Sequence, residues 1–352
     1  MKKRSLLLLA LLLAFSTLLA GCNVVTTPAT ENKDSGANSN SSVDNSQDKA
    51  DQNIKVVMMP KAIGNSYFAA AHEGAKTAAA DIKIDLTYNG PTTLNASQQV
   101  SMINGYVSQG YNVLAVSAAD PTSLVPALKA AKQKGIKVVT WDSDVEPSAR
   151  DFFVNQATSE GIGTTLVKLV AEKFNAPVDV AILSSTPSDP NQIDWINSMK
   201  KAIDEKYQNV NIVTTQYDNG QPDQALKVAG DLIKAYPNVK AIIAPESIAL
   251  PGAAEAVEKA GKKGEIYVTG LANPAVMKKY VHNDTVEHFV LWDVTDLGKL
   301  TMHVSRAAAD GTISENGTYK VEGLGEFEVK DGIVLLGLPK VFDKSNIDQF
   351  DY

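Results

Sequence analysis

The chain has 352 residues, of which 44% are hydrophobic and 21% are charged, a composition typical of a globular protein with room for two domains. Its formal net charge of -7 argues against nucleic-acid binding, which requires a basic face for the phosphates. A single cysteine excludes an intrachain disulfide, and four histidines without metal-binding spacing predict no metal and no cofactor.

The first 22 residues have the layout of an export signal. Three basic residues, Lys2 to Arg4, precede an apolar run over residues 6–19, and Leu-Ala-Gly-Cys ends at Cys22. The run is shorter than the roughly 20 residues that a transmembrane helix needs. Leu-Ala-Gly-Cys resembles the lipobox of bacterial lipoproteins, whose cysteine is acylated, and two acyl chains give stable anchoring. We therefore expect an extracytoplasmic protein that Cys22 anchors to the cell membrane.

Residues 23–53 have a different composition. They include six asparagines and five serines, no aromatic residue, and only three large apolar side chains, all valines. Such a segment cannot bury enough apolar surface to offset its ordering entropy. We predict a disordered tether here, with the folded part beginning at residue 54.

From residue 54 onward, short β-rich runs alternate with longer helical patterns. The first series predicts strands at 54–60, 83–88, 113–117 and 138–142, and helices at 67–81, 95–108 and 123–133. The second predicts strands at 178–184, 210–216, 241–245 and 265–270, and helices at 160–174, 189–206, 221–236 and 249–260. A further strand at 286–291 leads into a helix at 294–310. This alternation indicates an α/β fold with two lobes, each a doubly wound parallel sheet.

Ligands of such sheets bind beyond the carboxyl ends of the strands. The predicted strand ends are followed by polar and aromatic residues: Lys61, Trp141-Asp142, Asp189, Asn191, Gln192, Asp194-Trp195, Pro245-Glu246-Ser247 and Trp292-Asp293. Each of the three tryptophans adjoins an aspartate. Carboxylates accept hydrogen bonds from hydroxyls, lysine and amides donate them, and an indole covers the apolar face of a sugar ring. The set predicts a neutral, hydroxyl-rich ligand.

Structural roles compete with this interpretation. Asp189 and Asp293 stand where helix N-caps are common, and Trp195 lies on a predicted helix where core packing is the more frequent role. Lys61 alone would be a solvated surface charge, but its place directly after a buried strand favours a site role.

The folded part also resembles a known family. The stretches MMPKAIGNSYF, DLTYNGPT, VSAADPTSLVPALKAA, TWDSD, IVTTQY, AIIAPESIALPGAAEA, FVLWDV and VFDKSNIDQFDY are similar to periplasmic-binding-protein-like sugar receptors of the ribose/rhamnose class. Within that class they most resemble the autoinducer-2-binding receptors of ABC importers. The resemblance implies a type 1 periplasmic binding protein fold, with a hinge of three crossovers between the lobes.

The resemblance also implies a set of ligand-binding residues: Lys61, Asp142, Asn191, Gln192, Pro245 and Ser247. Two of them depart from the autoinducer-2 pattern, because Asn191 replaces an aspartate and Ser247 an alanine. Asn-Gln before the tryptophan is also similar to rhamnose-binding relatives. Tyr67, Phe68, Trp292 and Asp293 are expected to be secondary ligand contacts or hinge residues.

The lobe boundaries follow from these elements. We expect one lobe to comprise 54–157 with about 292–320, and the other 158–291 with about 321–352. The crossovers are predicted near 155–156, near 292–293 and after the helix at 294–310.

The function implied is binding, not catalysis. A monomer would close over a small neutral polyhydroxylated ligand, and an ABC permease would recognise the closed form. Autoinducer-2 is the first expectation, and rhamnose or another monosaccharide is the alternative. A sugar sensor that reports to a membrane kinase would have the same site. An enzyme is disfavoured because neither G-x-S-x-G nor G-x-x-x-x-G-K-[ST] occurs.

Overall fold

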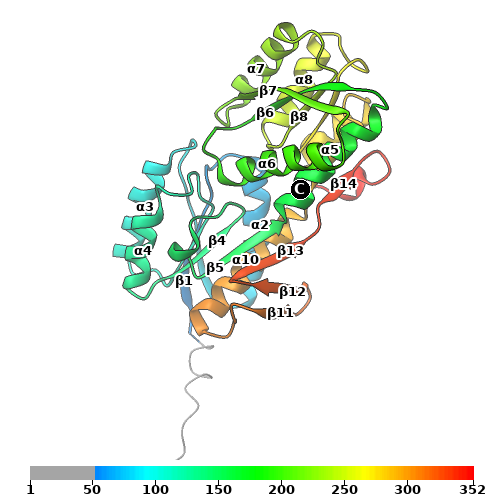
Figure 1. Cartoon of the computed structure of the whole chain (residues 1–352). Coiled ribbons are helices and arrows are strands. Elements are labelled where there is room, and N and C mark those ends of the chain that lie inside the picture. The colour runs from blue at the N-terminus through cyan, green and yellow to red at the C-terminus, as the bar shows by residue number, and fades with distance from the viewer. Residues whose placement is uncertain (1–51) are drawn as a thin grey trace, which may run out of the picture. The chain divides into compact units, whose positions relative to one another are not determined.

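The computed structural model of the chain describes residues 52–352, so the predicted signal peptide, Cys22 and nearly all of the predicted tether lie outside the described residues. Strands and helices alternate along most of the chain, and all described residues belong to one compact unit (Figure 1). The predicted α/β fold class is confirmed, with parallel strands forming the centre of both large sheets.

The first lobe is built on an eight-stranded sheet with the order β11-β12-β13-β5-β4-β3-β1-β2. Its central strands consist almost wholly of buried apolar residues, as expected for parallel strands covered on both faces. The parallel strands are β1 (Ile54–Met59), β2 (Ile84–Tyr88), β3 (Val113–Val116), β4 (Lys137–Trp141), β5 (Phe152–Ala157) and β13 (Ile333–Gly337). The antiparallel edge is formed by β11 (Gly317–Val321) and β12 (Gly325–Lys330).

Four helices cover this sheet. Helices α3 (Ala96–Ser108) and α4 (Val125–Gln133) pack on one face, where Val57 and Leu114 belong to the same apolar cluster as Ile103 and Leu128. Helices α2 (Ser66–Asp81) and α10 (Val294–Asp310) pack against each other over the other face. Alternate residues of each central strand therefore contribute to two separate cores.

Two glycines let α2 and α10 approach closely. A Cβ atom on Gly298 would lie 1.8 Å from the backbone oxygen of Ala71, and one on Gly74 would lie 1.9 Å from the backbone oxygen of Thr295. Only glycine fits at such a backbone contact. The close packing brings the start of α2, with Tyr67, next to the segment that enters α10, with Trp292.

The second lobe has a four-stranded parallel sheet with the order β7-β6-β8-β9, comprising β6 (Val178–Ser184), β7 (Val210–Tyr217), β8 (Ala241–Ala244) and β9 (Tyr267–Gly270). A bridge between Leu271 and Val290 joins β10 (Phe289–Leu291) to this sheet, and β10 pairs with β14 (Lys340–Phe342). The helices of this lobe are α5 (Ser159–Lys173), α6 (Pro190–Glu205), α7 (Pro222–Ala235), α8 (Ala249–Lys259) and α9 (Pro274–His282).

Three connections join the lobes: from β5 to α5, from β10 to α10, and from β13 to β14. The third lies near residue 338, not directly after the α10 region. The prediction that 321–352 belongs to the second lobe is wrong for its first part, because β12 pairs with β13 and β13 pairs in parallel with β5. These strands extend the sheet of the first lobe before the chain crosses for the last time.

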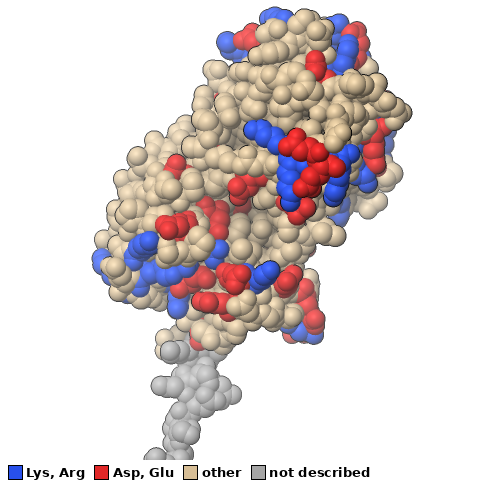
Figure 2. All heavy atoms as spheres, in the orientation of Figure 1, with Lys and Arg blue, Asp and Glu red and all other residues tan. Residues whose placement is uncertain are grey.

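The surface of the described part carries charges of both signs. Acidic and basic side chains interleave on the face shown in Figure 2 instead of forming one basic field. Many of them are paired within helices, as in Lys227 with Asp231 and Lys259 with Glu255. Within residues 52–352, no helix is both long enough and apolar enough to cross a membrane.

Candidate functional site

A cavity of about 220 Å³ lies between the two lobes, where the loops after β1, β4, β6, β8 and β10 meet. Its position fits the rule that ligands of open α/β sheets bind beyond the carboxyl ends of the strands. Drug-sized ligands usually occupy larger pockets, of about 300–1,000 Å³, so this volume suits a molecule of monosaccharide size.

The structure brings the predicted ligand residues together. All six line this cavity: Lys61, Asp142, Asn191, Gln192, Pro245 and Ser247. Of the predicted secondary residues, Tyr67, Phe68 and Trp292 also line it. Asp293 does not, because its carboxylate caps α10 by accepting hydrogen bonds from the backbone N–H of Asp296 and the hydroxyl of Thr295. Cys22 lies outside the described residues.

Asp142 has a backbone conformation that side chains rarely adopt. Its φ of 61° lies in the left-handed region, which aspartate tolerates better than most residues. The carboxylate accepts hydrogen bonds from Tyr67 Oη at 2.9 Å and Ser117 Oγ at 2.7 Å. Burial raises the pKa of Asp142, whereas the charge of Lys61 and these two hydrogen bonds lower it. The strained turn after β4 therefore aims an anchored carboxyl group into the cleft.

Lys61 is the cation of the site and is only 4% exposed. Its ammonium lies 3.9 Å from Asp142 Oδ2 in its own lobe. Across the cleft it donates to Asp189 Oδ1 at 2.6 Å and to Asn191 Oδ1 at 2.9 Å. Lysine has three donors, and these two hydrogen bonds use two of them, which leaves one for a ligand oxygen.

Aromatic rings form part of the wall. Trp292 Nε1 donates to Tyr67 Oη at 3.1 Å, and the ring of Trp292 lies 6.0 Å from that of Trp195. Each Trp-Asp pair of the sequence sends one member to the cavity: Asp142 but not Trp141, Trp195 but not Asp194, and Trp292 but not Asp293. Trp141 is instead fully buried in the core. Trp195 packs in the core, the more frequent role for a tryptophan on a helix, and it also lines the cavity.

The second lobe contributes two further acids, Glu246 and Asp218, whose charges interact. Glu246 lines the cavity, and its Oε2 accepts hydrogen bonds from the backbone N–H groups of Ile248 and Ala249 at the start of α8. Asp218 is fully buried, accepts from the N–H of Gly220, and leaves its Oδ2 without a partner. Burial raises the pKa of Asp218 to about 7, and burial together with the charge of Asp218 raises that of Glu246 to about 8.

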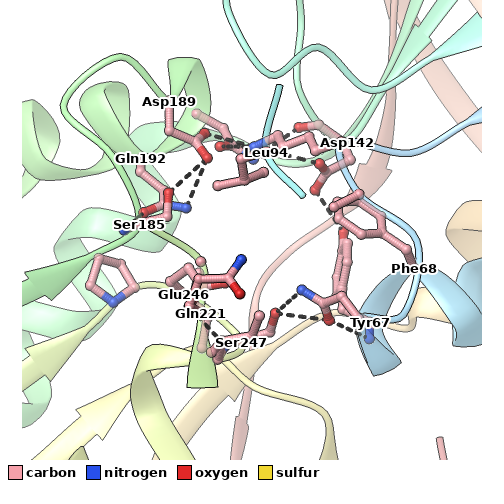
Figure 3. Close-up of a pocket in the computed structure, with 18 of the residues that line it drawn as sticks. Tyr67, Phe68, Leu94, Asp142, Ser185, Asp189, Gln192, Gln221, Glu246 and Ser247 are labelled. Atoms are coloured by element: carbon pink, nitrogen blue, oxygen red, sulfur yellow. Dashed lines mark hydrogen bonds and ion pairs between the residues drawn. The ribbon is translucent and has the colours of Figure 1, made fainter. Parts of the chain in front are cut away.

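Direct contacts close the cleft at several points (Figure 3). Asn65 Nδ2 of the first lobe donates to Ser247 Oγ of the second at 3.0 Å, and Asn191 Nδ2 donates to the backbone oxygen of Asp142 at 3.3 Å. At the mouth, Leu94 lies so close to Gly220 that a Cβ atom there would meet its Cδ1 at 2.8 Å. The two lobes therefore hold a closed arrangement around the cavity.

The six ligand residues that the resemblance implies leave out several residues that line the cavity: Asn65, Leu94, Ser185, Asp189, Gln221 and Glu246. Glu246 stands between two selected residues and could have been included on its position alone. For Asp189 the sequence leaves a helix cap and a site role open, and its side chain forms no capping hydrogen bond. Leu94 and Gln221 lie in loops whose meeting across the cleft depends on how the lobes pack, which local patterns do not encode.

Known proteins share both the sequence and the architecture of this chain. The family model of the periplasmic binding protein domain matches residues 56–313. The chain belongs to this family. A D-ribose/D-allose-binding protein from Pseudomonas aeruginosa is 25% identical over 245 residues, which are 66% of this chain and 75% of that protein. The family predicted from the sequence is thereby confirmed.

Two solved structures cover 85% of this chain. LsrB from Clostridium saccharobutylicum in complex with AI-2 is 29% identical, is covered over 100% of its length and has a TM-score of 0.81. An ABC transporter solute-binding protein from Clostridium phytofermentas with bound L-rhamnose is 28% identical, is covered over 98% and has a TM-score of 0.82. The chain is thus a substrate-binding protein of the class that serves sugar ABC transporters, a class of extracytoplasmic binding proteins rather than enzymes.

Proposed function

We propose that this protein is a lipid-anchored, extracytoplasmic receptor that binds autoinducer-2 for uptake by an ABC importer. The observation that carries the proposal is the convergence of Lys61, Asp142, Asn191, Gln192, Pro245 and Ser247 on one small cavity. The likeness to the structure with bound AI-2, over nearly the whole folded part, supports it.

The chemistry of the cavity suits a small hydroxylated furanose-like ligand. The carboxylates of Asp142 and Asp189 accept hydrogen bonds from hydroxyl groups, while the ammonium of Lys61 and the amide of Gln192 donate to ligand oxygens. Trp195 and Trp292 offer apolar surface to the C–H groups of a ring. The two departures from the autoinducer-2 pattern keep the cavity polar, because Asn191 retains a carbonyl acceptor and Ser247 adds a hydroxyl.

Binding works by lobe closure. The ligand contacts residues from both lobes, so it binds the closed arrangement more tightly than the open one and shifts the population toward it. The three connections between the lobes allow a hinge motion, and Trp292 lies at one of them while touching the cavity. The closed form is the state that a permease partner would accept, and Cys22 would keep the receptor at the membrane surface.

L-Rhamnose is the second candidate ligand. It is favoured by the likeness to the solute-binding protein with bound L-rhamnose, whose TM-score equals that of the AI-2 complex within 0.01. Asn191 followed by Gln192 before Trp195 is the local feature that fits this alternative.

Ligand identification tests the proposal. The purified protein is heated to release bound small molecules, and the supernatant is assayed with an autoinducer-2 reporter strain while the emptied protein is titrated with L-rhamnose in a thermal-shift assay. We expect reporter activity and a Kd for autoinducer-2 that weakens strongly in Lys61→Met. A silent reporter, together with a clear thermal shift from L-rhamnose, would replace the first ligand with the second.

A further inference from the structure

Asp189 occupies the N-cap position of α6 but does not act as a cap. Its backbone has the extended conformation of an N-cap, with φ of -69° and ψ of 114°, yet its side chain makes no capping hydrogen bond. Instead, Oδ1 accepts from Lys61 Nζ at 2.6 Å, and Oδ2 accepts from Ser185 Oγ at 3.0 Å and Gln192 Nε2 at 3.1 Å (Figure 3). The residue is 2% exposed. The carboxylate of Asp189 therefore does not cap the helix but forms a buried ion pair across the cleft with a lysine of the other lobe.

The ammonium of Lys61 is shared between the lobes. In the first lobe it lies 3.9 Å from Asp142 Oδ2, while its two shortest contacts, to Asp189 and Asn191, are both with the second lobe. Charge-assisted hydrogen bonds are roughly twice as strong as neutral ones. The stronger link between the lobes at this point is therefore the one to the Asp189 carboxylate.

Asp189 and Asn191 both present an oxygen to Lys61. Both are second-lobe side chains whose Oδ1 atoms lie within hydrogen-bond distance of the same lysine nitrogen, at 2.6 and 2.9 Å. A carboxylate at either position would reach Lys61. Asn191 is neutral, and the negative charge beside Lys61 on this lobe is carried by Asp189, two residues earlier in the chain.

We propose that Asp189 is a positioning residue of the ligand site, whose carboxylate draws Lys61 across the cleft, favours the closed arrangement, and holds the Gln192 amide toward the ligand. This inference rests on the proposed role of the cleft as the ligand site. It adds a residue to the six that the family resemblance implies, and it explains how the site keeps two carboxylates around its lysine with asparagine at 191.

The first test exchanges the two side chains. Asp189→Asn removes the closer carboxylate of Lys61 but leaves Asp142 nearby, so the variant should still fold, with a lowered melting temperature. We expect its affinity for autoinducer-2 to fall by roughly 5- to 15-fold, because a charge-assisted hydrogen bond becomes a neutral one. In the double variant Asp189→Asn/Asn191→Asp, a carboxylate returns to Lys61, but the hydrogen bond from Asn191 Nδ2 to the Asp142 backbone oxygen and the carboxylate acceptor of Gln192 are lost. Its affinity should therefore recover in part, to about threefold above that of Asp189→Asn. Both are measured by isothermal titration calorimetry.

The second test needs no ligand. Spin labels are placed at cysteines that replace Ser97 and Gln224, exposed residues at the starts of α3 and α7 on opposite lobes, in protein carrying Cys22→Ser. The interlobe distance distribution of ligand-free protein should contain a smaller closed fraction in Asp189→Asn and a partly restored fraction in the double variant. Because no ligand is added, this result stands even where autoinducer-2 is not the ligand.

The outcomes separate the two proposals. Absence of autoinducer-2 binding in the parent protein overturns the proposed ligand, while the distance distributions still decide the role of Asp189. Unchanged affinity and unchanged distances in Asp189→Asn overturn the positioning role. A double variant with the same distances as Asp189→Asn overturns the role in drawing Lys61 across the cleft, since Asp189 would then act only on its own lobe through Ser185 and Gln192.

Discussion

The two walls of the cleft hold their acidic groups in different ways. In the first lobe, Asp142 accepts hydrogen bonds from Tyr67 and Ser117 and has Lys61 nearby. In the second lobe, Asp189 also pairs with Lys61, but Glu246 and the neighbouring buried Asp218 accept hydrogen bonds only from backbone N–H groups, and among residues 52–352 no lysine or arginine forms an ion pair with these two.

The cavity thus has a fixed wall in the first lobe, where side chains orient the carboxyl group of Asp142. It has a titratable wall in the second lobe, next to Glu246 and Asp218. Fixed donors and a cation stabilise the charged form of a buried carboxyl group, whereas burial and a neighbouring acid disfavour it. For Asp142 burial outweighs these groups and its pKa is raised, but the two side-chain donors and Lys61 still fix the orientation of its carboxyl group. The wall of the second lobe retains a proton within the physiological pH range, with pKa values of about 7 for Asp218 and about 8 for Glu246.

The largest effect on ligand affinity is expected from a change at Asp142 on the fixed wall. Asp142→Asn keeps the size and the tolerance for positive φ but removes the charge beside Lys61. Because it removes a ligand acceptor and leaves Lys61 less compensated, we expect affinity for the ligand to fall by about 100-fold or more. Calorimetric titration measures the change.

Asp85→Asn is the matched control, because Asp85 is an exposed aspartate of the same lobe on β2. It should leave affinity unchanged. An affinity of Asp142→Asn within threefold of the parent protein would contradict the assignment of Asp142 to the site.

The second prediction concerns stability on the titratable wall. The folded-state pKa of Glu246, about 8, lies above its ordinary value of 4.5, so folding favours its protonated form. Its contribution to stability is fully present below about pH 4.5 and is lost as the pH rises through 8. Glu246→Gln removes this titration, and its amide oxygen can still accept from the N–H groups of Ile248 and Ala249. The variant should gain stability relative to the parent by on the order of a few kcal/mol at pH 9.

Thermal unfolding at pH 5 and pH 9 measures this gain. The difference in melting temperature between Glu246→Gln and the parent should be larger at pH 9. Glu322→Gln, at an exposed glutamate, makes the same change of charge and should show no such trend. Equal differences at the two pH values would show that Glu246 is already ionised in the folded protein at pH 5.

The sequence predicts those parts of the molecule that depend on local order. Buried strands such as β3 and β8 consist of continuous apolar runs, and the residues that directly follow a strand must lie at its carboxyl end. Lys61 and Asp142 were found in this way. Repeated β-α alternation is enough to predict two lobes of parallel sheet.

The remainder depends on long-range packing. The strands at 317–337 do not alternate with helices, so no local pattern indicates that they extend the first sheet instead of entering the second lobe. Asp189 has the sequence position of a helix cap, and only the approach of Lys61 from the other lobe, 128 residues earlier, gives it another partner. Asp218 and Glu246 likewise become neighbours only when the loops after β7 and β8 meet.

The smallest effect on ligand affinity is expected where two neutral side chains form a hydrogen bond between the lobes. Asn65 Nδ2 donates to Ser247 Oγ at 3.0 Å, and both side chains are only partly buried. A neutral hydrogen bond of this kind contributes about 0.5–1.5 kcal/mol, so Ser247→Ala should weaken ligand binding by roughly 2- to 12-fold. A double-mutant cycle with Asn65→Ala isolates the interaction, because two residues that act through one bond give less than additive losses. Strictly additive losses in calorimetric titrations would mean that each contacts the ligand independently and that the bond between the lobes contributes nothing to closure.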